Sequence, residues 1–415
     1  MNIVMFTDAY YPRVNGVAVS VKSYAEELAR LGHRVCIVCP DYNSNYVDEY
    51  DKDTFFKHFF YEYAPYGDKN LELLRIPSDK LLWSHEDRAV RLNQWHTVKE
   101  QVDKFKPDVV HVNSEFVMGW YGVAYARHAH IALVFTFHTL WEDYLENYLH
   151  MIPSAFSQKI GRDLVKFYLK RADEIIVPTE RIKSVIKRYG IDRPSDILPT
   201  GIPSKIVDYD EKKALDFNEK FFSEFPLLKD KRILLFVGRI VKEKNLSFLF
   251  PIITRVVKSF PDVALLFVGG GPELEHLKNE AKKIDMDESI FFTDYRPREE
   301  LVYFYHLSSV FVFPSLTETQ GLVTVEAMMT GLPVVAIAEM GTLDVMQGDN
   351  GGFMVKNDEK LFADKVIQLL TDKELYAKKS KEAKEWGNKW SMKSLTPQLV
   401  KLFEKGIKIK KEKVL

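Results

Sequence analysis

The sequence predicts an α/β protein made of two similar, doubly wound domains. A chain of 415 residues is long for a single domain. Strand and helix patterns alternate from Met1, and the alternation starts again at Arg232. Segments 106–112 and 260–268 each show a helix end, a Pro-Asp turn and a buried strand of the parallel type. We therefore expect one domain over residues 1–200 and a second over 204–385, joined by a hinge in segment 197–203.

The composition is that of an ordinary soluble protein. Hydrophobic residues make up 46% of the chain and charged residues 28%. The 58 lysines and arginines nearly balance the 59 acidic residues, so the overall charge gives no support for nucleic-acid binding. No apolar segment approaches the roughly 20 residues of a membrane span, and the chain opens on a strand rather than a signal sequence. These features predict a cytoplasmic protein.

The two cysteines, Cys36 and Cys39, have the Cys-x-x-Cys spacing found in some metal and redox sites. They lie within a strand pattern, however, where this spacing directs the two side chains to opposite faces. No second pair of Cys or His residues follows at a suitable spacing. We expect two buried, reduced thiols and no metal site.

The first domain opens with a strand over residues 1–6, a loop over 7–16 and a helix over 17–31. That loop lacks the Gly-x-Gly-x-x-Gly fingerprint of dinucleotide binding, which argues against an NAD-dependent oxidoreductase. Segment 55–66 is rich in Phe and Tyr, and it either packs on the core or forms an apolar acceptor surface. The other expected elements are strands over 35–39, 108–113, 131–138 and 173–178 and helices over 115–127 and 179–189.

The most informative stretch of the second domain is a buried strand, a short polar loop and a helix over residues 311–328. Ligands of parallel α/β sheets bind at the carboxyl ends of the strands, and a helix N-terminus there offers free N–H groups to anions. Glu318 in the loop and Glu326 in the helix would then flank a phosphate-sized pocket. Taken alone, however, such a pair of carboxylates is more often a solvated helix charge.

Two further loops of the second domain follow strands. Arg239 and Lys244 lie in the loop after the strand over 233–237, where both can face a ligand; the alternative is a solvated surface pair. The glycine loop 269–271 follows the strand over 265–268, and a tight turn would also explain it. The last helix is expected over 395–405, followed by a basic tail.

Together these loops and the Glu318/Glu326 pair resemble the retaining GT-B glycosyltransferases of family 4, and the resemblance covers nearly the whole chain. Within that family, segments 6–8, 15–17, 138–144 and 318–322 resemble the bacterial diacylglycerol glucosyltransferases. The resemblance implies two Rossmann-like domains facing a cleft, with the nucleotide sugar in the C-terminal domain and the acceptor in the N-terminal one. It also implies that a C-terminal helix, residues 390–415, returns to the N-terminal domain.

The resemblance assigns roles to the donor-side residues. Arg239 and Lys244 would contact the pyrophosphate, Glu326 the two ribose hydroxyls and Glu318 the hydroxyls of the donor sugar. The remaining donor-binding residues are expected to be Gly16, Gly238, Gly270, Thr319, Gln320, Gly321, Leu322 and Val323, of which Gly321, Leu322 and Val323 offer backbone N–H groups. One departure from the family is Asp294, where many relatives carry Gly.

On the acceptor side, the resemblance places His138 against the donor sugar and the acceptor, and we count it with Arg239, Lys244 and Glu318 as a catalytic candidate. A solitary histidine at a strand end is otherwise more often a structural hydrogen bonder. Acceptor binding is expected from Asn15, Glu142 and Asp143. We expect no metal or cofactor. In the favoured chemistry the acceptor attacks on the face that the leaving phosphate occupies, and this phosphate takes the acceptor proton.

A basic stripe marks segment 156–171. At helical spacing Lys159, Arg162, Lys166 and Lys170 share one face, beside an apolar stripe of Phe156, Ile160, Leu164 and Phe167. The pattern fits a helix on an anionic membrane surface, and it fits equally an ordinary helix with its apolar stripe in the core.

The sequence therefore predicts a cytoplasmic, peripheral membrane enzyme that transfers glucose from UDP-glucose to diacylglycerol. The alternatives are a family 4 enzyme with another acceptor (a glycolipid, a polysaccharide primer or a soluble alcohol) and a nucleotide-binding module without transferase activity.

Overall fold

The computed structural model describes the whole chain apart from residues 14, 43–68, 82–83, 139–153, 319 and 415. It divides into two compact units. Unit 1 comprises Met1–Gly201 and Met392–Leu415, and unit 2 comprises Ile202–Ser391. The chain first passes from one unit to the other between Gly201 and Ile202, inside segment 197–203.

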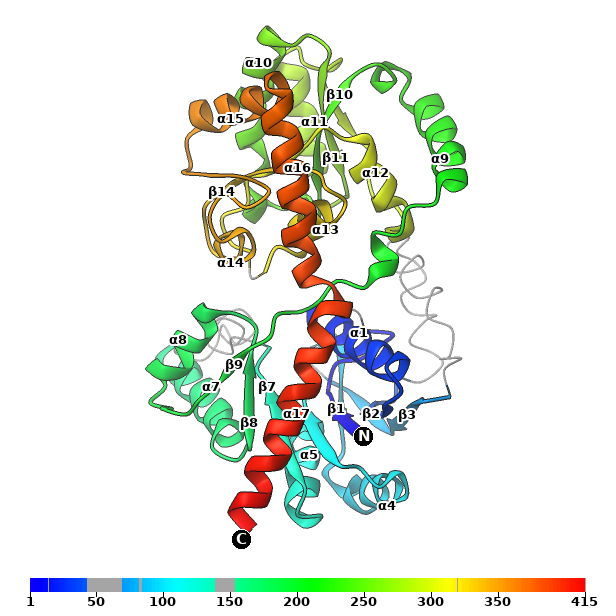
Figure 1. Cartoon of the computed structure of the whole chain (residues 1–415), viewed down its shortest axis with the longest axis vertical. Helices are drawn as coiled ribbons and strands as arrows, with labels where there is room; N and C mark the ends of the chain where they lie inside the picture. Colours follow the sequence, from blue (N-terminus) through cyan, green and yellow to red (C-terminus); the bar gives the residue numbers. More distant parts are fainter. Residues whose placement is uncertain (14, 43–68, 82–83, 139–153, 319, 415) are drawn as a thin grey trace. The chain divides into compact units, whose positions relative to one another are not determined.

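The described part of unit 1 is built on a seven-stranded parallel sheet with the order β3-β2-β1-β6-β7-β8-β9 (Figure 1). Its strands are β1 (Asn2–Phe6), β2 (Arg34–Pro40), β3 (Leu71–Ile76), β6 (Val109–Val112), β7 (Ala132–Thr136), β8 (Glu174–Val177) and β9 (Asp196–Ile197). A separate antiparallel hairpin pairs β4 (Ser78–Leu81) with β5 (Ser84–Val90). The strand order reverses between β1 and β6, because β2 lies on one side of β1 and β6 on the other.

Helices cover both faces of this sheet, as the alternation of side chains along the strands requires. On β1, Ile3 and Met5 face a core shared with α1 (Gly16–Arg30) and α17 (Met392–Val414). Val4 and Phe6 face the opposite core. That core includes α4 (Trp95–Phe105), α5 (Val117–His128), α7 (Ser154–Leu169) and α8 (Glu180–Arg188).

The prediction of two buried thiols on opposite faces of the strand is confirmed. Cys36 and Cys39 are both free and buried, and they lie in the two opposite cores of unit 1. Burial raises the pKa of each thiol to about 12, so both stay protonated and unreactive near neutral pH.

Unit 2 repeats the plan with a six-stranded parallel sheet in the order β12-β11-β10-β13-β14-β15. The strands are β10 (Arg232–Val237), β11 (Val263–Val268), β12 (Ile290–Phe292), β13 (Val310–Phe313), β14 (Val334–Ile337) and β15 (Gly352–Val355). The helices are α9 (Glu211–Glu224), α10 (Leu249–Ser259), α11 (Leu274–Lys283), α12 (Leu301–Leu307), α13 (Leu322–Met329), α14 (Gly341–Met346), α15 (Glu359–Thr371) and α16 (Lys373–Gly387). Here the strand order reverses between β10 and β13. Among the described residues, no helix of either unit is long and apolar enough to cross a bilayer.

The returning helix predicted from the family resemblance is confirmed, since α17 packs along unit 1 against α1, β7 and β8 (Figure 1). The predicted extent of 395–405 was wrong, because the helix runs from Met392 to Val414. The residues expected to form a basic tail continue this helix, and carboxylates of unit 1 pair with its lysines. Lys405 pairs with Glu174 at 3.0 Å and with Asp196, and Lys413 pairs with Asp173 at 2.9 Å. These ion pairs hold the final turns in place.

We predict that Phe403→Ala destabilises the protein by about 3–5 kcal/mol, because the ring on α17 is fully buried in the core of unit 1 and its loss leaves a cavity. Chemical denaturation followed by tryptophan fluorescence measures the loss. Lys408→Ala on the same helix, whose side chain is 79% exposed, is the control and should change stability by no more than about 0.5 kcal/mol. Equal effects of the two substitutions would show that α17 does not pack on unit 1.

Candidate functional site

Three of the predicted donor-side residues, Arg239, Lys244 and Glu318, lie at the switch point of the sheet in unit 2. Ligands of parallel α/β sheets bind beyond the carboxyl ends of the strands where the strand order reverses. Arg239 and Lys244 follow β10, and Glu318 follows β13, the two strands between which the order reverses. Residues that are far apart in the sequence therefore leave the sheet side by side.

Lys244 and Glu318 form an ion pair that joins these two loops. Their side chains are only 14% and 18% exposed, so solvent screens the pair weakly. Lys244 ends the short helix η4 (Lys242–Lys244), and the next residue, Asn245, turns the chain in a left-handed conformation and donates to the Pro314 carbonyl at 3.4 Å. Burial lowers the pKa of the Lys244 ammonium to about 8, while the Glu243 carboxylate raises it.

Arg239 lies beside this pair but remains open to solvent. Its side chain is 64% exposed and makes a 3.3 Å ion pair with Glu243. Its positive charge is close enough to lower the pKa of Lys244 further. The two cations therefore share one corner of the site, and an anion bound there would relieve their repulsion.

The start of α13 offers backbone donors next to Glu318. Gly321 caps this helix with φ near 60° and without a side-chain cap, so the first N–H groups, from Leu322 and Val323, have no acceptor within the helix. The side-chain nitrogen of Gln320 is buried and has no partner in the described part of the chain. Thr319 lies outside the described residues. The turn thus offers donors where the sequence predicts phosphate binding.

Glu326 on α13 is almost fully buried, at 2% exposure. Its two oxygens each accept one hydrogen bond, at 2.9 Å, from Arg298 of η6 (Arg298–Glu300) and from the Tyr305 hydroxyl of α12. The sequence-based prediction missed both partners, which stand in segments without a strong motif. A carboxylate oxygen has two lone pairs, so each oxygen of Glu326 keeps one that neither of these two hydrogen bonds uses.

The glycine loop after β11 is explained by close packing. A Cβ on Gly270 would lie 2.4 Å from the Asp294 carboxylate oxygen and 2.5 Å from the Tyr295 ring. Ile240, in the loop that carries Gly238, donates to the Gly270 carbonyl at 2.8 Å, so the two loops are tied together. The simpler interpretation, a tight structural loop, therefore accounts for Gly270 by itself.

In unit 1, His138 lies just beyond β7 and is half-buried. Its Nε2 is 3.1 Å from the Oδ1 of Asn113, which lies just beyond β6. Asp8, beyond β1, accepts hydrogen bonds from the Ser114 hydroxyl at 2.6 Å and from the Met118 N–H at 3.0 Å. The sequence pattern did not single out Asn113 or Ser114, because both look like the end of an ordinary buried strand.

Burial keeps the histidines of this region neutral. It lowers the pKa of His138 to about 4. The neighbouring His111 has its pKa lowered to about 3 by burial and by repulsion from His138. Both rings therefore act as neutral hydrogen-bonding groups near neutral pH.

The other predicted site residues of unit 1, on both the donor and the acceptor side, lie at the start of α1 or outside the description. Asn15 is the N-cap of α1, where its Oδ1 accepts from the Ala18 N–H at 2.9 Å. Gly16 begins α1, and a Cβ there would meet no atom within 4 Å, so packing does not explain this glycine. Glu142, Asp143 and the aromatic segment 55–66 lie outside the described residues.

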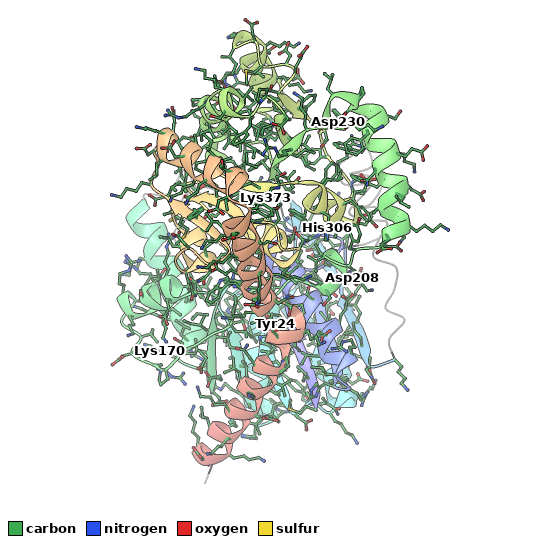
Figure 2. The ribbon with its side chains drawn as sticks, turned by 45° about the horizontal axis from the view of Figure 1, so that its top comes forward. Tyr24, Lys170, Asp208, Asp230, His306 and Lys373 are labelled. Carbon is green, nitrogen blue, oxygen red and sulfur yellow. The ribbon has the colours of Figure 1, made fainter. Side chains whose placement is uncertain are left out.

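The basic stripe lies on α7. Lys159 and Lys170 are exposed, and Arg162 and Lys166 are half-buried; Lys170 is labelled in Figure 2. Leu164 and Phe167, from the predicted apolar stripe, pack against the core beside the fully buried Val165, Tyr168 and Leu169. In this half of the helix the apolar stripe belongs to the core. The side chains of Phe156 and Ile160 lie outside the description.

Comparison with known proteins covers both halves of the chain. The profile of Glycosyltransferase Family 4 matches residues 14–205, and the profile of Glycosyl transferases group 1 matches residues 217–386. The alpha-monoglucosyldiacylglycerol synthase of Streptococcus pneumoniae is 29% identical over 338 residues, or 81% of this chain and 71% of the relative. The protein of the same name from Acholeplasma laidlawii is 29% identical over 368 residues, or 86% of each chain.

A solved structure, Anabaena HepE in complex with UDP, has the same fold, with a TM-score of 0.69 at 14% identity over 97% of this chain and 100% of that one. Like this protein, the structural neighbours are built from two Rossmann-like domains. The chain is a GT-B glycosyltransferase, with a Glycosyltransferase Family 4 domain followed by a glycosyl transferases group 1 domain.

Proposed function

We propose that this glycosyltransferase moves glucose from UDP-glucose to diacylglycerol with retention of the anomeric configuration. The observation that carries the proposal is the joining of Lys244 and Glu318 at the switch point of unit 2. The acceptor is inferred from the relatives that match 81% and 86% of the chain and are named for glucosylation of diacylglycerol. The motif resemblance in segments 6–8, 138–144 and 318–322 points to the same acceptor.

On the donor side, the departing diphosphate gains negative charge as the glycosidic bond breaks. Arg239 and Lys244 provide fixed positive charge for it, and the N–H groups at the start of α13 provide oriented dipoles. When a diphosphate takes the place of Glu318 beside Lys244, the carboxylate becomes free to accept hydroxyls of the sugar. Glu326 holds the ribose through its remaining lone pairs.

The transfer step needs no carboxylate nucleophile. The bond from the anomeric carbon to the diphosphate oxygen breaks, and a bond from this carbon to the acceptor oxygen forms on the same face. The acceptor proton passes to the diphosphate oxygen. His138, neutral and half-buried, is suited to hold a hydroxyl group of a substrate rather than to carry a charge.

Membrane attachment, in this proposal, is electrostatic. Lys159, Arg162, Lys166 and Lys170 present positive charge along α7, while the described apolar side chains of this helix are committed to the core. The protein would therefore bind anionic lipid headgroups at the cytoplasmic face without inserting this half of the helix.

The direct test is a thin-layer assay that offers labelled UDP-glucose to three acceptors: diacylglycerol, monoglucosyl-diacylglycerol and water-soluble alcohols. We expect a single labelled product from diacylglycerol. Labelling of monoglucosyl-diacylglycerol or a soluble alcohol alone would move the protein to the alternative, a family 4 enzyme with another acceptor. A nucleotide-binding module without transferase activity would label none of the three.

We predict that Lys244→Met lowers kcat by about 10²–10³-fold, because it removes a buried cation from the leaving diphosphate. Initial rates of labelled product formation measure the change. Lys242→Met, in the same short helix, is the matched control and should stay within a few-fold of the wild-type rate. A Lys244→Met enzyme of normal turnover would remove this residue from the catalytic site.

Glu326→Gln and Glu318→Gln should separate nucleotide binding from turnover. We predict that Glu326→Gln weakens UDP binding by roughly 10-fold, the cost of about one hydrogen bond, when calorimetry measures the Kd. Glu318→Gln should lower kcat by about 10-fold or more with little change in UDP affinity. Because Glu326 is buried against Arg298, thermal unfolding of this variant must be measured in parallel. The reverse ranking of the two variants would overturn the assignment.

We predict that reversing the charges of Lys159, Arg162, Lys166 and Lys170 to Glu weakens binding to anionic vesicles by at least about 10²-fold, since each cation near such a surface contributes about 1 kcal/mol. Vesicle sedimentation at low and high salt measures the effect. A variant with Lys212, Lys213, Lys220 and Lys229 of unit 2 changed to Glu carries the same charge change and should bind as the wild type does. Equal binding by both variants would exclude α7 as the attachment site.

A further inference from the structure

His138 has one hydrogen-bond partner within the described part of the chain, and this partner is Asn113. The side-chain oxygen of Asn113 lies 3.1 Å from Nε2 of the imidazole. Asn113 itself is held firmly, because it is 2% exposed and its backbone N–H donates to the Phe6 carbonyl of β1 at 2.9 Å. A rigid, buried amide therefore faces one nitrogen of the ring.

The orientation of the Asn113 side-chain amide follows from its contact with the backbone carbonyl of His111. The Asn113 Nδ2 group points at the carbonyl of His111, at 3.5 Å. If the Asn113 amide were flipped, its oxygen would face the His111 carbonyl oxygen, and two hydrogen-bond acceptors would lie against each other without a proton between them. In this orientation the oxygen of Asn113 faces His138, and a hydrogen bond between them requires the proton on Nε2.

The groups around His138 leave this arrangement undisturbed. A small cavity beside the ring is lined by described residues of unit 1, among them Tyr24, His111 and Thr136, and none of these lining residues carries a carboxylate. His111 on β6 pairs with the Thr136 hydroxyl at 2.7 Å and meets the Phe403 ring edge-on at 5.2 Å. Tyr24 of α1, labelled in Figure 2, donates to the Pro199 carbonyl at 2.7 Å. Among the described residues that line the cavity, none supplies a negative charge that would favour a second proton on the ring.

We propose that Asn113 is a positioning residue that locks His138 in its Nε2-protonated, neutral form, so that Nδ1 presents a lone pair to a hydroxyl group of the sugar or the acceptor. The inference rests on the proposed glucosyl transfer for the identity of this hydroxyl. A neutral ring with a free lone pair accepts a hydrogen bond, whereas the other tautomer or the charged ring can only donate from Nδ1. Asn113 thereby determines that Nδ1 of His138 accepts, rather than donates, a hydrogen bond.

The tautomer is measured directly by ¹⁵N NMR of the full-length protein labelled in histidine, with His138→Gln used to assign the signals. We expect an unprotonated Nδ1, a protonated Nε2 and no titration of this ring between about pH 5.5 and 8.5, because burial lowers the pKa of His138 to about 4. A protonated Nδ1, or a ring that is charged at neutral pH, would overturn the proposal whatever the acceptor.

Asn113→Asp provides the second test, since it keeps the shape of the side chain and places a carboxylate beside Nε2. An adjacent negative charge raises the pKa of an imidazole, so His138 should titrate near neutral pH in this variant. The charged ring has no lone pair, and kcat should therefore fall at least about 10-fold from pH 8.5 to pH 6 relative to the wild-type profile. Asn113→Leu should lower kcat at every pH without this slope.

Asn70→Asp is the matched control, because it adds the same charge to unit 1 at a partly buried site whose amide contacts the Ala29 carbonyl. It should keep the wild-type pH profile. A wild-type profile in Asn113→Asp would reduce Asn113 to a structural role. If the NMR result is as expected but no acceptor is glucosylated, the proposed function fails and the tautomer lock stands. Glucosylation by an enzyme with the opposite tautomer would exclude the lock and leave the proposed function intact.

Discussion

The ion pair between Lys244 and Glu318 is the contact on which the candidate site of unit 2 depends. It ties together the loops that leave β10 and β13, the two strands between which the sheet of unit 2 reverses its order. A largely buried ion pair is not a strong source of stability, because desolvation of the two charges offsets most of their attraction. Removal of either partner is nevertheless costly to stability, because it leaves an unpaired charge in a largely buried site. Such a pair is well suited to being opened by a ligand that replaces one of the two charges.

In both units the polar residues of the candidate site lie just beyond the ends of strands of the parallel sheet. In each, the strands of a parallel sheet are largely buried and mostly apolar. Polar side chains appear where strands end: Lys244 and Glu318 after β10 and β13, and Asn113 and His138 after β6 and β7. The chemistry is therefore carried by loops, and the rigid sheets fix their starting points.

The sequence predicted the two-unit α/β fold. It also predicted that Arg239, Lys244 and Glu318 lie at one ligand site, because strand patterns and loop positions are local signals. It did not predict the partners of Glu326, since Arg298 and Tyr305 meet it only through tertiary packing. It also ended the last helix too early, because the ion pairs that hold the final turns involve residues far away in the sequence. Helical spacing correctly placed the four basic residues along α7. It could not show that Leu164 and Phe167 pack against the core of unit 1 rather than against a bilayer.

The candidate sites of the two units differ in the charge of their titratable groups. Burial keeps His138 and His111 neutral above about pH 5, because their pKa values are lowered to about 4 and about 3. In unit 2, burial lowers the pKa of the Lys244 ammonium to about 8, whereas the paired Glu318 carboxylate favours the protonated form. A diphosphate beside Lys244 would favour the protonated form and raise this pKa, so donor binding and protonation of Lys244 support each other.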